Sequence, residues 1–456
     1  MSKKIHFIAV GGSIMHNMAI ALHKTGYVVS GSDDEIYEPS KSRLSKHGLL
    51  PVKNGWDADR ITEDLDAIIL GMHARPENPE LLRAQELGIK IYSFPEFIYE
   101  QSKDKQRVVI AGSHGKTSIT SMILHVLKYH NRSFDYAVGA QIQGFGEMVQ
   151  FSDAPVIIIE GDEYLTSPID RTPKFLKYHH HIGLISGIAW DHINVFPTQE
   201  EYNKQFELFV NATPSDGTIV YFNGDKLVSE LNKRNDHKSL PYDTHAHLIE
   251  NGITYLITNK TKVPLKVFGK HNLQNLNGAR FILNKIGIVD EEFYEAIQSF
   301  EGAANRLEVT YSDDKNIIFK DFAHAPSKVR ATTASVREQY PEREVVACLE
   351  LHTFSSLTKE FLKQYNECLE KAHFPCVYFD PKIVKRKKLA PITANDVRKA
   401  FKTEGLEVFT DRDQMVAYLK EFDWTNKNLL LMSSGDFGHL DYSSIELILH
   451  SKENLQ

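Results

Sequence analysis

The stretch of residues 108–118 constrains this chain most, because strand, turn and helix patterns follow one another there without a break. The apolar run Val108–Ala111 is typical of a buried strand, and the pattern of Ile119–Leu127 predicts a helix. Two glycines and a lysine lie between them. Such a turn places backbone N–H groups and the positive end of the helix dipole around one point, which predicts a phosphate site.

The residue types of this turn suit a nucleotide with its metal ion. Lys116 would reach the β- and γ-phosphates, and the Thr117 hydroxyl would bind Mg²⁺. The general motif is GxxxxGK[ST], but Ile110 stands five residues before Gly115, so this is the shorter Gly-x-x-Gly-Lys-Thr type. The alternative is a glycine turn with a surface lysine. The predicted nucleotide contacts are Gly112, Ser113, His114, Gly115, Lys116, Thr117 and Ser118.

Length and composition narrow the class of protein. A chain of 456 residues favours about three domains rather than one core. The net charge of −7 argues against nucleic-acid binding, so a nucleotide is a more plausible ligand than a polymer. No apolar run is long enough for a membrane span, and Ser2-Lys3-Lys4 leads directly into a strand, so we expect no membrane segment or signal peptide. Three cysteines without CxxC spacing complete the pattern of a cytoplasmic protein.

The N-terminal residues follow the order of a Rossmann unit. A strand at 5–10 is followed by the turn Gly11-Gly12-Ser13, a helix at 14–25 and a strand at 28–33 that ends in Asp33. In such a unit the glycines lie at a phosphate and the acid lies at a ribose. Ile14 replaces the third glycine, so we predict a Rossmann-like domain and keep NAD binding as an alternative. A strand at 66–70 precedes His73, and the polar residues 101–106 resemble a linker.

Acidic residues follow a second buried strand in the centre of the chain. Val156–Ile159 leads into Glu160-Gly161-Asp162-Glu163. Carboxylates at the C-terminal edge of a parallel strand, beside a phosphate loop, suit Mg²⁺, although a solvated acidic turn is the alternative. A strand at 182–188 precedes Trp190-Asp191-His192. Gly269–Asn275 opens a helix, where a histidine or asparagine could contact an adenine or cap the helix.

Strands and helices alternate again after residue 300. Asp321-Phe322-Ala323-His324 follows the second strand of this region, and the basic run Lys385–Lys388 could form a solvated face or meet an acidic substrate. The order predicts a doubly wound domain. The predicted strands lie at 308–311, 316–320, 345–351, 377–379, 407–409 and 429–432.

These motifs together resemble those of the Mur ligase superfamily, which consists of ATP-dependent amide ligases with three α/β domains. The resemblance implies an N-terminal Rossmann-like domain (1–103) for a UDP-sugar, a central P-loop ATPase-like parallel sheet (104–300) for ATP, and a C-terminal Rossmann-like domain (301–456) for an amino acid or peptide. The matching motifs, in the family's order, are Gly112–Thr117, Glu160–Glu163, Asp191-His192, His271–Asn275, Asn305–Glu308 and Asp321–His324. Departures from the family pattern are Gly161 for alanine, Gly187 for asparagine and Ala325 for a second histidine.

The resemblance also implies a reaction and its residues. A lactoyl carboxylate attacks the γ-phosphate of ATP, and an amine then converts the acyl phosphate to an amide. Neither step needs a nucleophile from the enzyme. Positioning of the substrates and neutralisation of charge would therefore supply most of the rate enhancement. The implied catalytic residues are Lys116, Glu160 and His192, and the implied Mg²⁺ ligands are Thr117, Glu160 and His192.

Other roles follow from the same resemblance. Asn272 would contact the adenine, and Arg306 and Asp321 would reach the nucleotide from the third domain after closure. The UDP diphosphate would lie at the first glycine turn. The implied contacts of the UDP-sugar are Gly11, Gly12, Ser13, Asp33 and His73.

Two branches of the superfamily fit the chain. One joins UDP-N-acetylmuramate to L-alanine in peptidoglycan synthesis, and the other joins it to the recycled murein tripeptide L-alanyl-γ-D-glutamyl-meso-diaminopimelate. Gly12–Met15, Ile36–Pro39 and Asp170–Tyr178 resemble the tripeptide branch, whereas Leu351–Ser355 is nearer the alanine branch. We therefore predict the tripeptide as the acceptor and keep L-alanine as the alternative. We expect the protein to be a monomer or a weak homodimer.

Two interpretations from other classes remain open at this point. A nucleotide-binding regulator with a dead active site would not need Lys116, Thr117, Glu160 and His192 together. A dehydrogenase would need a complete dinucleotide fingerprint and a catalytic histidine–acid pair, and neither stands out. Turnover of ATP that depends on UDP-N-acetylmuramate would separate the three classes.

Overall fold

The computed structural model describes residues 2–190, 195–233, 238–303, 306–443 and 445. Their contacts divide the chain into two compact units, one of residues 1–244 and 274–297 and one of residues 245–273 and 298–456. Both units combine strands with helices, which confirms the α/β class. The domain boundaries at 103 and 300 stay predictions. Within the described ranges, no helix is both long and apolar enough to cross a membrane.

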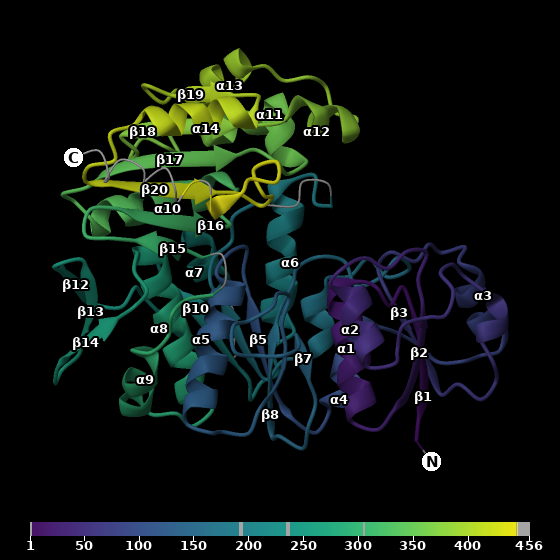
Figure 1. The fold of residues 1–456 in the computed structure, drawn as a ribbon. Helices are drawn as coiled ribbons and strands as arrows, with labels where there is room; N and C mark the ends of the chain where they lie inside the picture. The colour runs from purple at the N-terminus through teal and green to yellow at the C-terminus, as the bar shows by residue number, and fades with distance from the viewer. Residues whose placement is uncertain (1, 191–194, 234–237, 304–305, 444, 446–456) are drawn as a thin grey trace. The chain divides into compact units, whose positions relative to one another are not determined.

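The first sheet is parallel, with the order β2-β1-β3-β4, and helices cover both of its faces (Figure 1). Phe7 packs into the same core as Met18 of α1, whereas Ile8 joins Leu81 of α3 in a second cluster. Neighbouring strand residues point to opposite faces, so both faces are apolar. The elements are β1 (Lys4–Ile8), α1 (Ser13–Lys24), β2 (Val28–Ser32), α2 (Ser40–Lys46), η1 (Ala58–Arg60), β3 (Ala67–Leu70), α3 (Pro79–Glu86), β4 (Ile91–Ser93) and α4 (Phe94–Gln101).

The second sheet places the predicted phosphate loop at its centre. Its order is β11-β10-β9-β5-β8-β6-β7, and only the edge strand β7 is antiparallel to its neighbour. The predicted strand at 108–111 and helix at 119–127 are confirmed by β5 and α5. The strands are β5 (Gln106–Ala111), β6 (Asp135–Ala137), β7 (Val149–Gln150), β8 (Val156–Glu160), β9 (Ile182–Ile185), β10 (Thr218–Phe222) and β11 (Lys238–Tyr242). The helices are α5 (Lys116–Tyr129), η2 (Lys174–Tyr178), α6 (Gln199–Asn211), α7 (Lys226–Asn232), α8 (Lys270–Lys285) and α9 (Asp290–Ile297).

A short turn joins the first sheet to the second. Helix α4 ends at Gln101 and β5 begins at Gln106, as the predicted linker requires. The Arg107 guanidinium fixes this turn, because its NH1 atom donates to the carbonyl oxygens of Ser102, Lys103 and Lys105 at 2.7–3.1 Å. Arg107 is buried, and its Nε also donates to His179 O. The linker is therefore held in one conformation by the strand that follows it.

The second unit contains two sheets. One is antiparallel, with the order β12-β13-β14, and the other has the order β15-β16-β20-β17-β18-β19, in which only β15 is antiparallel to its neighbour. The strands predicted between 308 and 432 are all present. The strands are β12 (His247–Glu250), β13 (Ile253–Ile257), β14 (Lys262–Leu265), β15 (Glu308–Ser312), β16 (Ile317–Asp321), β17 (Glu344–Glu350), β18 (Phe374–Tyr378), β19 (Glu407–Phe409) and β20 (Lys427–Met432). The helices are α10 (Pro326–Gln339), η3 (Ser355–Leu357), α11 (Lys359–Leu362), η4 (Lys363–Tyr365), α12 (Pro381–Arg386), α13 (Ala394–Phe401) and α14 (Arg412–Glu421).

Candidate functional site

The loop between β5 and α5 requires both of its glycines. Gly112 has φ = 131° and Gly115 has φ = 79°, which are conformations that other residues rarely adopt. A Cβ atom on Gly112 would collide with Ser186 Oγ, and one on Gly115 would collide with Asn275 Oδ1. The two glycines therefore serve both the backbone conformation and the close approach of neighbouring side chains.

Two helices begin at glycine turns without a side-chain cap. Helix α5 begins after Gly115 and α1 begins after Gly12, and neither helix has a capping hydrogen bond from a side chain. In contrast, Asn78, Thr198 and Asp225 cap α3, α6 and α7. Uncapped first-turn N–H groups at a helix N-terminus favour an anionic ligand. Both predicted phosphate sites thus lie at helix N-termini without a side-chain cap, and phosphate binding there stays a prediction.

Lys116 is not the surface lysine of the alternative interpretation. Its side chain is 14% exposed, and Nζ donates to Glu163 Oε2 at 2.6 Å and to Gly112 O at 2.7 Å. Burial disfavours the charged amine, but the carboxylates of Glu163 and Asp162 outweigh burial and raise the pKa of Lys116. The lysine is therefore cationic and already paired before any phosphate is bound.

A tyrosine from α6 completes this arrangement. The Tyr202 hydroxyl lies 2.7 Å from Glu163 Oε1 and 2.8 Å from Ser113 Oγ, and the Ala189 N–H donates to Ser113 Oγ at 2.8 Å. Ser113, a predicted nucleotide contact, uses its side chain to hold the loop against this tyrosine. Sequence patterns contain no signal for Tyr202, because it lies far from the loop along the chain and no motif includes it.

Glu160 and Thr117 form the predicted metal side of the loop. Thr117 Oγ1 donates to Glu160 Oε1 at 2.8 Å, and Gly139 N donates to Glu160 Oε2 at 3.1 Å. Burial raises the pKa of Glu160, although Lys116 and these two donors oppose the shift. Oxygen atoms of a carboxylate and a hydroxyl fit Mg²⁺.

Within the described residues, no group of three or more His, Cys, Asp or Glu side chains could hold an ion. Mg²⁺ usually binds through one or two carboxylates, water and substrate phosphates, so the Glu160 site fits that ion better than a closed centre would. The predicted ligand His192 lies outside the described residues, as does Asp191.

His114 and Ser118 complete the predicted loop. The carbonyl oxygen of His114 accepts a hydrogen bond from Ser186 Oγ, and Ser118 is buried in the first turn of α5. The Asp162 carboxylate, between the two glutamates, pairs with Lys174 Nζ at 3.0 Å. The site therefore contains three carboxylates and two lysines. They are those of Glu160, Asp162, Glu163, Lys116 and Lys174.

Asp33 holds the first glycine turn. Its Oδ2 accepts the Gly11 N–H at 2.7 Å, and its Oδ1 accepts the Asp34 N–H at 2.9 Å. A Cβ on Gly11 would lie 2.9 Å from Asp33 Oδ2, so glycine allows this approach. Burial, together with a hydrogen bond to the Asp34 carboxyl group, raises the pKa of Asp33 to about 6. The acid predicted at a ribose thus also fixes the turn in front of α1.

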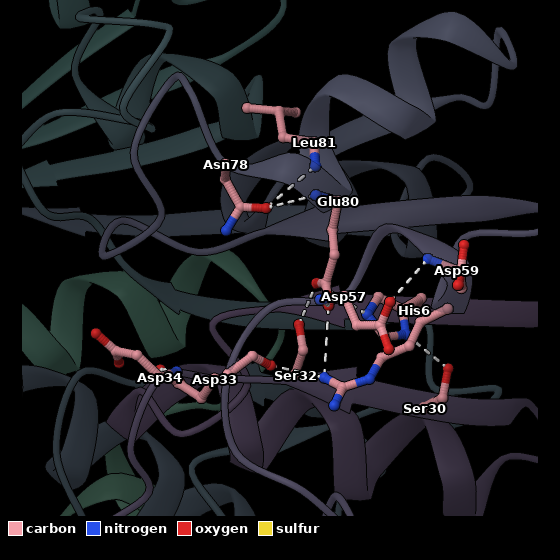
Figure 2. Close-up of polar contacts among 12 residues, drawn as sticks. His6, Ser30, Ser32, Asp33, Asp34, Asp57, Asp59, Asn78, Glu80 and Leu81 are labelled. Carbon is pink, nitrogen blue, oxygen red and sulfur yellow. Dashed lines mark hydrogen bonds and ion pairs between the residues drawn. The ribbon is translucent and has the colours of Figure 1, made fainter.

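A buried glutamate supports the strand that leads to Asp33 (Figure 2). Glu80 is fully buried, and its carboxylate accepts hydrogen bonds from Ser32 Oγ and from the Asp57 N–H, the latter at 2.9 Å. The His6 ring and the Arg60 guanidinium lie 3.4 and 3.5 Å away. Figure 2 shows the Glu80 side chain extending toward Ser32, Asp57 and His6. His73, a predicted substrate contact, is exposed after β3.

Three predicted nucleotide contacts belong to the second unit. The Asn272 side chain donates through Nδ2 to Phe268 O at 2.9 Å, just before the start of its own helix α8. Asp321 ends β16 and accepts the N–H groups of Leu307 and Ala323, both at 2.7 Å, and burial raises its pKa. The Arg306 guanidinium lies 4.9 Å from the centre of the Phe322 ring.

A second polar cluster lies at the C-terminal ends of β17 and β20. The buried carboxylate of Glu350 accepts hydrogen bonds from Ser433 Oγ and from the Phe437 N–H, the latter at 2.8 Å, and lies 3.5 Å from His352 Nδ1. The Phe437 ring is fully buried, so only its backbone serves this cluster. Ligands of doubly wound sheets bind at this edge of the strands. The sequence did not single out Glu350.

Comparison with known proteins gives the same family as the motifs. A family model described as the Mur ligase middle domain matches residues 110–283, and one described as Mur ligase family, catalytic domain, matches residues 4–106. A UDP-N-acetylmuramate–L-alanine ligase of Sulfurihydrogenibium sp. is 28% identical over 376 residues, which are 80% of each chain. A UDP-N-acetylmuramate–L-alanyl-γ-D-glutamyl-meso-2,6-diaminoheptandioate ligase of Haemophilus influenzae is 27% identical over 74% of this chain and 77% of its own.

A solved structure shows the same fold. The UDP-N-acetylmuramate–alanine ligase of Thermotoga maritima superposes with a TM-score of 0.68 over 99% of this chain and 100% of its own, at 20% identity. The two family matches together span most of the first and second sheets, and the phosphate loop, Glu160 and the first glycine turn all lie within them. The chain belongs to the Mur ligase family, whose members are ATP-dependent ligases that form amide bonds.

Proposed function

We propose that this ligase joins UDP-N-acetylmuramate to the murein tripeptide L-alanyl-γ-D-glutamyl-meso-diaminopimelate, as in peptidoglycan recycling in the cytoplasm. The proposal assigns the UDP-sugar to residues 1–103, ATP to residues 104–300 and the peptide to residues 301–456. It takes the protein to be a monomer or a weak homodimer. The three ligand assignments rest on the motifs and contacts described above.

ATP is proposed to bind at the loop between β5 and α5. Lys116 would turn from Glu163 toward the β- and γ-phosphates, and the first-turn N–H groups of α5 would contact the same oxygens. Glu160 and Thr117, with His192, would hold Mg²⁺, which would neutralise charge on the transferring phosphoryl group. On the resemblance alone, the proposal adds Asn272, Arg306 and Asp321 as nucleotide contacts.

The proposed reaction has two steps. A carboxylate oxygen of the sugar's lactoyl group attacks the γ-phosphorus, the bond to the β-phosphate oxygen breaks, and ADP leaves. The amine of the acceptor then attacks the acyl carbon, the bond between that carbon and the phosphate oxygen breaks, and inorganic phosphate leaves with the proton that the amine gives up. Lys116 would stabilise the negative charge that develops on the phosphoryl oxygens in the first step. Neither step requires a covalent bond to the enzyme.

The first glycine turn is proposed to bind the diphosphate of the sugar nucleotide. Gly11, Gly12 and Ser13 precede the uncapped N-terminus of α1, and Asp33 fixes the turn through the Gly11 N–H. His73 would contact the same ligand from the exposed loop after β3. This assignment replaces NAD binding, for which the third glycine is missing.

The polar cluster around Glu350 is the observation that favours a tripeptide acceptor. The buried Glu350 carboxylate, Ser433 and His352 surround the strand ends where the acceptor of this sheet would bind. The methyl side chain of L-alanine offers nothing to such groups. The far end of the tripeptide carries an ammonium group and carboxylates, which can form charge-assisted hydrogen bonds.

L-Alanine is the second candidate acceptor. The Sulfurihydrogenibium and Thermotoga relatives named above are alanine ligases, and Leu351–Ser355 resembles that branch. Both acceptors present the same L-alanyl amine, so the chemistry at the acyl phosphate does not distinguish them. Discrimination must come from the remote part of the peptide.

The test supplies both acceptors in competition at saturating ATP and UDP-N-acetylmuramate. Two charge-assisted hydrogen bonds made only by the tripeptide would give at least about 100-fold higher kcat/KM than L-alanine. Mass analysis of the products shows which amine was joined. Equal values, or a preference for L-alanine, would establish the biosynthetic alanine ligase instead.

A further inference from the structure

Asn17 connects three segments of the first unit. It lies fully buried in the second turn of α1, and its Nδ2 donates to Ser13 O, in the first glycine turn, at 2.8 Å. Its Oδ1 accepts the Met148 N–H at 3.0 Å and Arg43 NH1 of α2 at 3.2 Å. One amide therefore joins the proposed diphosphate turn to a segment of the second sheet.

Arg43 extends the same contact along that segment, residues 139–148, which we name the bridging loop. Its NH2 donates to Gln141 Oε1 at 3.2 Å and also to Gly146 O. At the far end of the bridging loop, the Gly139 N–H donates to Glu160, which in turn accepts from Thr117. Hydrogen bonds and one short loop thus connect Ser13 at one glycine turn to Thr117 at the other.

This arrangement exceeds what adhesion between two sheets requires. The exposed ion pair between Lys24 Nζ and Glu147 Oε1, at 2.5 Å, already joins α1 to the bridging loop. A buried amide adds little net stability over an apolar side chain of similar volume, but it fixes one geometry because an unmet donor or acceptor is costly. Asn17 therefore serves mainly to fix the orientation of the first glycine turn relative to the loop that leads to the second.

We infer that Asn17 and Arg43 are positioning residues that couple binding of the sugar nucleotide at the first glycine turn to binding of MgATP at the phosphate loop. The inference rests on the proposed function, in which the sugar's carboxylate must meet the γ-phosphate. Small displacements between two reacting groups reduce rates strongly, so a fixed connection between their binding sites serves the first step. Because coupling is reciprocal, each ligand tightens the other by the same factor.

The experiment measures that factor directly. The Kd of AMP-PNP with Mg²⁺ is determined by calorimetry with and without saturating UDP-N-acetylmuramate, in the wild type and in three variants. Asn17→Leu removes the junction, Arg43→Met removes its contact with the bridging loop, and Lys24→Met removes the exposed ion pair as a matched control. We expect tighter AMP-PNP binding with the sugar in the wild type, and a loss of about fivefold or more of this ratio in the first two variants only.

Thermal unfolding separates positioning from general damage, since Arg43 is half-buried and its variant should unfold at the wild-type temperature. If Asn17→Leu does not fold, the comparison of Arg43→Met with Lys24→Met decides alone. A wild-type ratio of one, or an unchanged ratio in Arg43→Met, would overturn the inference and leave the proposed function intact. A wild type that binds AMP-PNP but not UDP-N-acetylmuramate would overturn both.

Discussion

Lys116 and Glu163 form an ion pair at 2.6 Å whose two side chains are 14% and 1% exposed. The lysine that we propose as a nucleotide contact is thus held by a carboxylate of the acidic motif that follows the neighbouring strand β8. In the proposed site, a bound nucleotide would therefore have to draw the amine away from Glu163. The ion pair therefore contributes to the stability of the ligand-free loop, and it involves the same lysine that we propose for catalysis.

Replacing Lys116 by methionine should lower turnover strongly and also weaken the fold. Loss of a charge contact with the transferring phosphoryl group lowers kcat by roughly 10²-fold or more. Glu163 would keep its hydrogen bond from Tyr202 but lose its cation, and a buried charge without its counter-charge costs about 3 kcal/mol. The double variant Lys116→Met, Glu163→Gln should recover the stability without the activity. Denaturant unfolding and steady-state kinetics measure both, and a single variant that keeps most of its turnover would refute the lysine's role.

Replacing Glu160 by glutamine should separate metal binding from folding. Without metal, the Glu160→Gln variant should unfold at a higher temperature than the wild type. The reason is that burial raises the pKa of Glu160 and thus disfavours its charged form. Loss of a carboxylate ligand should raise the Mg²⁺ concentration for half-maximal activity by about tenfold or more. The control Asp162→Asn removes a carboxylate that pairs with Lys174 instead. An unchanged Mg²⁺ requirement in Glu160→Gln would place the metal elsewhere.

Asp33 predicts a pH dependence of stability with a definite sign. Burial raises its pKa from 3.8 to about 6 in the folded state, so the native protein holds a proton that the unfolded chain has released between these values. The contribution of Asp33 is fully present below pH 3.8 and is lost as the pH rises through 6. An asparagine side chain cannot titrate, so Asp33→Asn should gain more stability over the wild type at pH 8 than at pH 4. Equal differences in unfolding temperature at the two pH values would contradict this.

Replacing Glu350 by glutamine should affect only the acceptor. The buried carboxylate orients Ser433 and the Phe437 N–H, and a charge-assisted hydrogen bond contributes about 1.5–3 kcal/mol. We expect kcat/KM for the tripeptide to fall by about tenfold or more, with the KM for ATP unchanged. Kinetics with each substrate varied in turn provide the measurement. A parallel rise of both KM values would mean that Glu350 supports the fold generally.

The sequence predicted the elements that local patterns define. The runs at 108–111 and 429–432 are continuous and apolar because these strands are buried on both faces, and their strands appear where expected. The antiparallel strands between 247 and 265 were missed because they are short and only partly buried. Their pattern is too weak to separate from loop.

The candidate site divides in the same way. Gly112, Lys116 and Thr117 could be placed from their spacing, because a phosphate loop is a local structure. Tyr202, Glu80 and Asn17 could not, since each acts through hydrogen bonds to residues distant in the chain. The roles predicted for His192 and His73 stay predictions. Long-range partners depend on how the sheets pack, which no single-chain pattern contains.

The Arg107 clamp on the turn after α4 determines how this protein can be taken apart. A fragment that ends at residue 103 or 105 would leave behind the guanidinium that holds the carbonyl oxygens of Ser102, Lys103 and Lys105. The complementary fragment would keep the contact between Arg107 and His179 O but lose the carbonyl oxygens of Ser102 and Lys103, so its buried cation would be only partly paired. Arg107 and its acceptors Ser102 and Lys103 would then lie in different fragments. Truncations or protease nicks meant to isolate the first sheet should therefore keep Arg107 and its three acceptors together, and a cut inside this turn should release unfolded material rather than two domains.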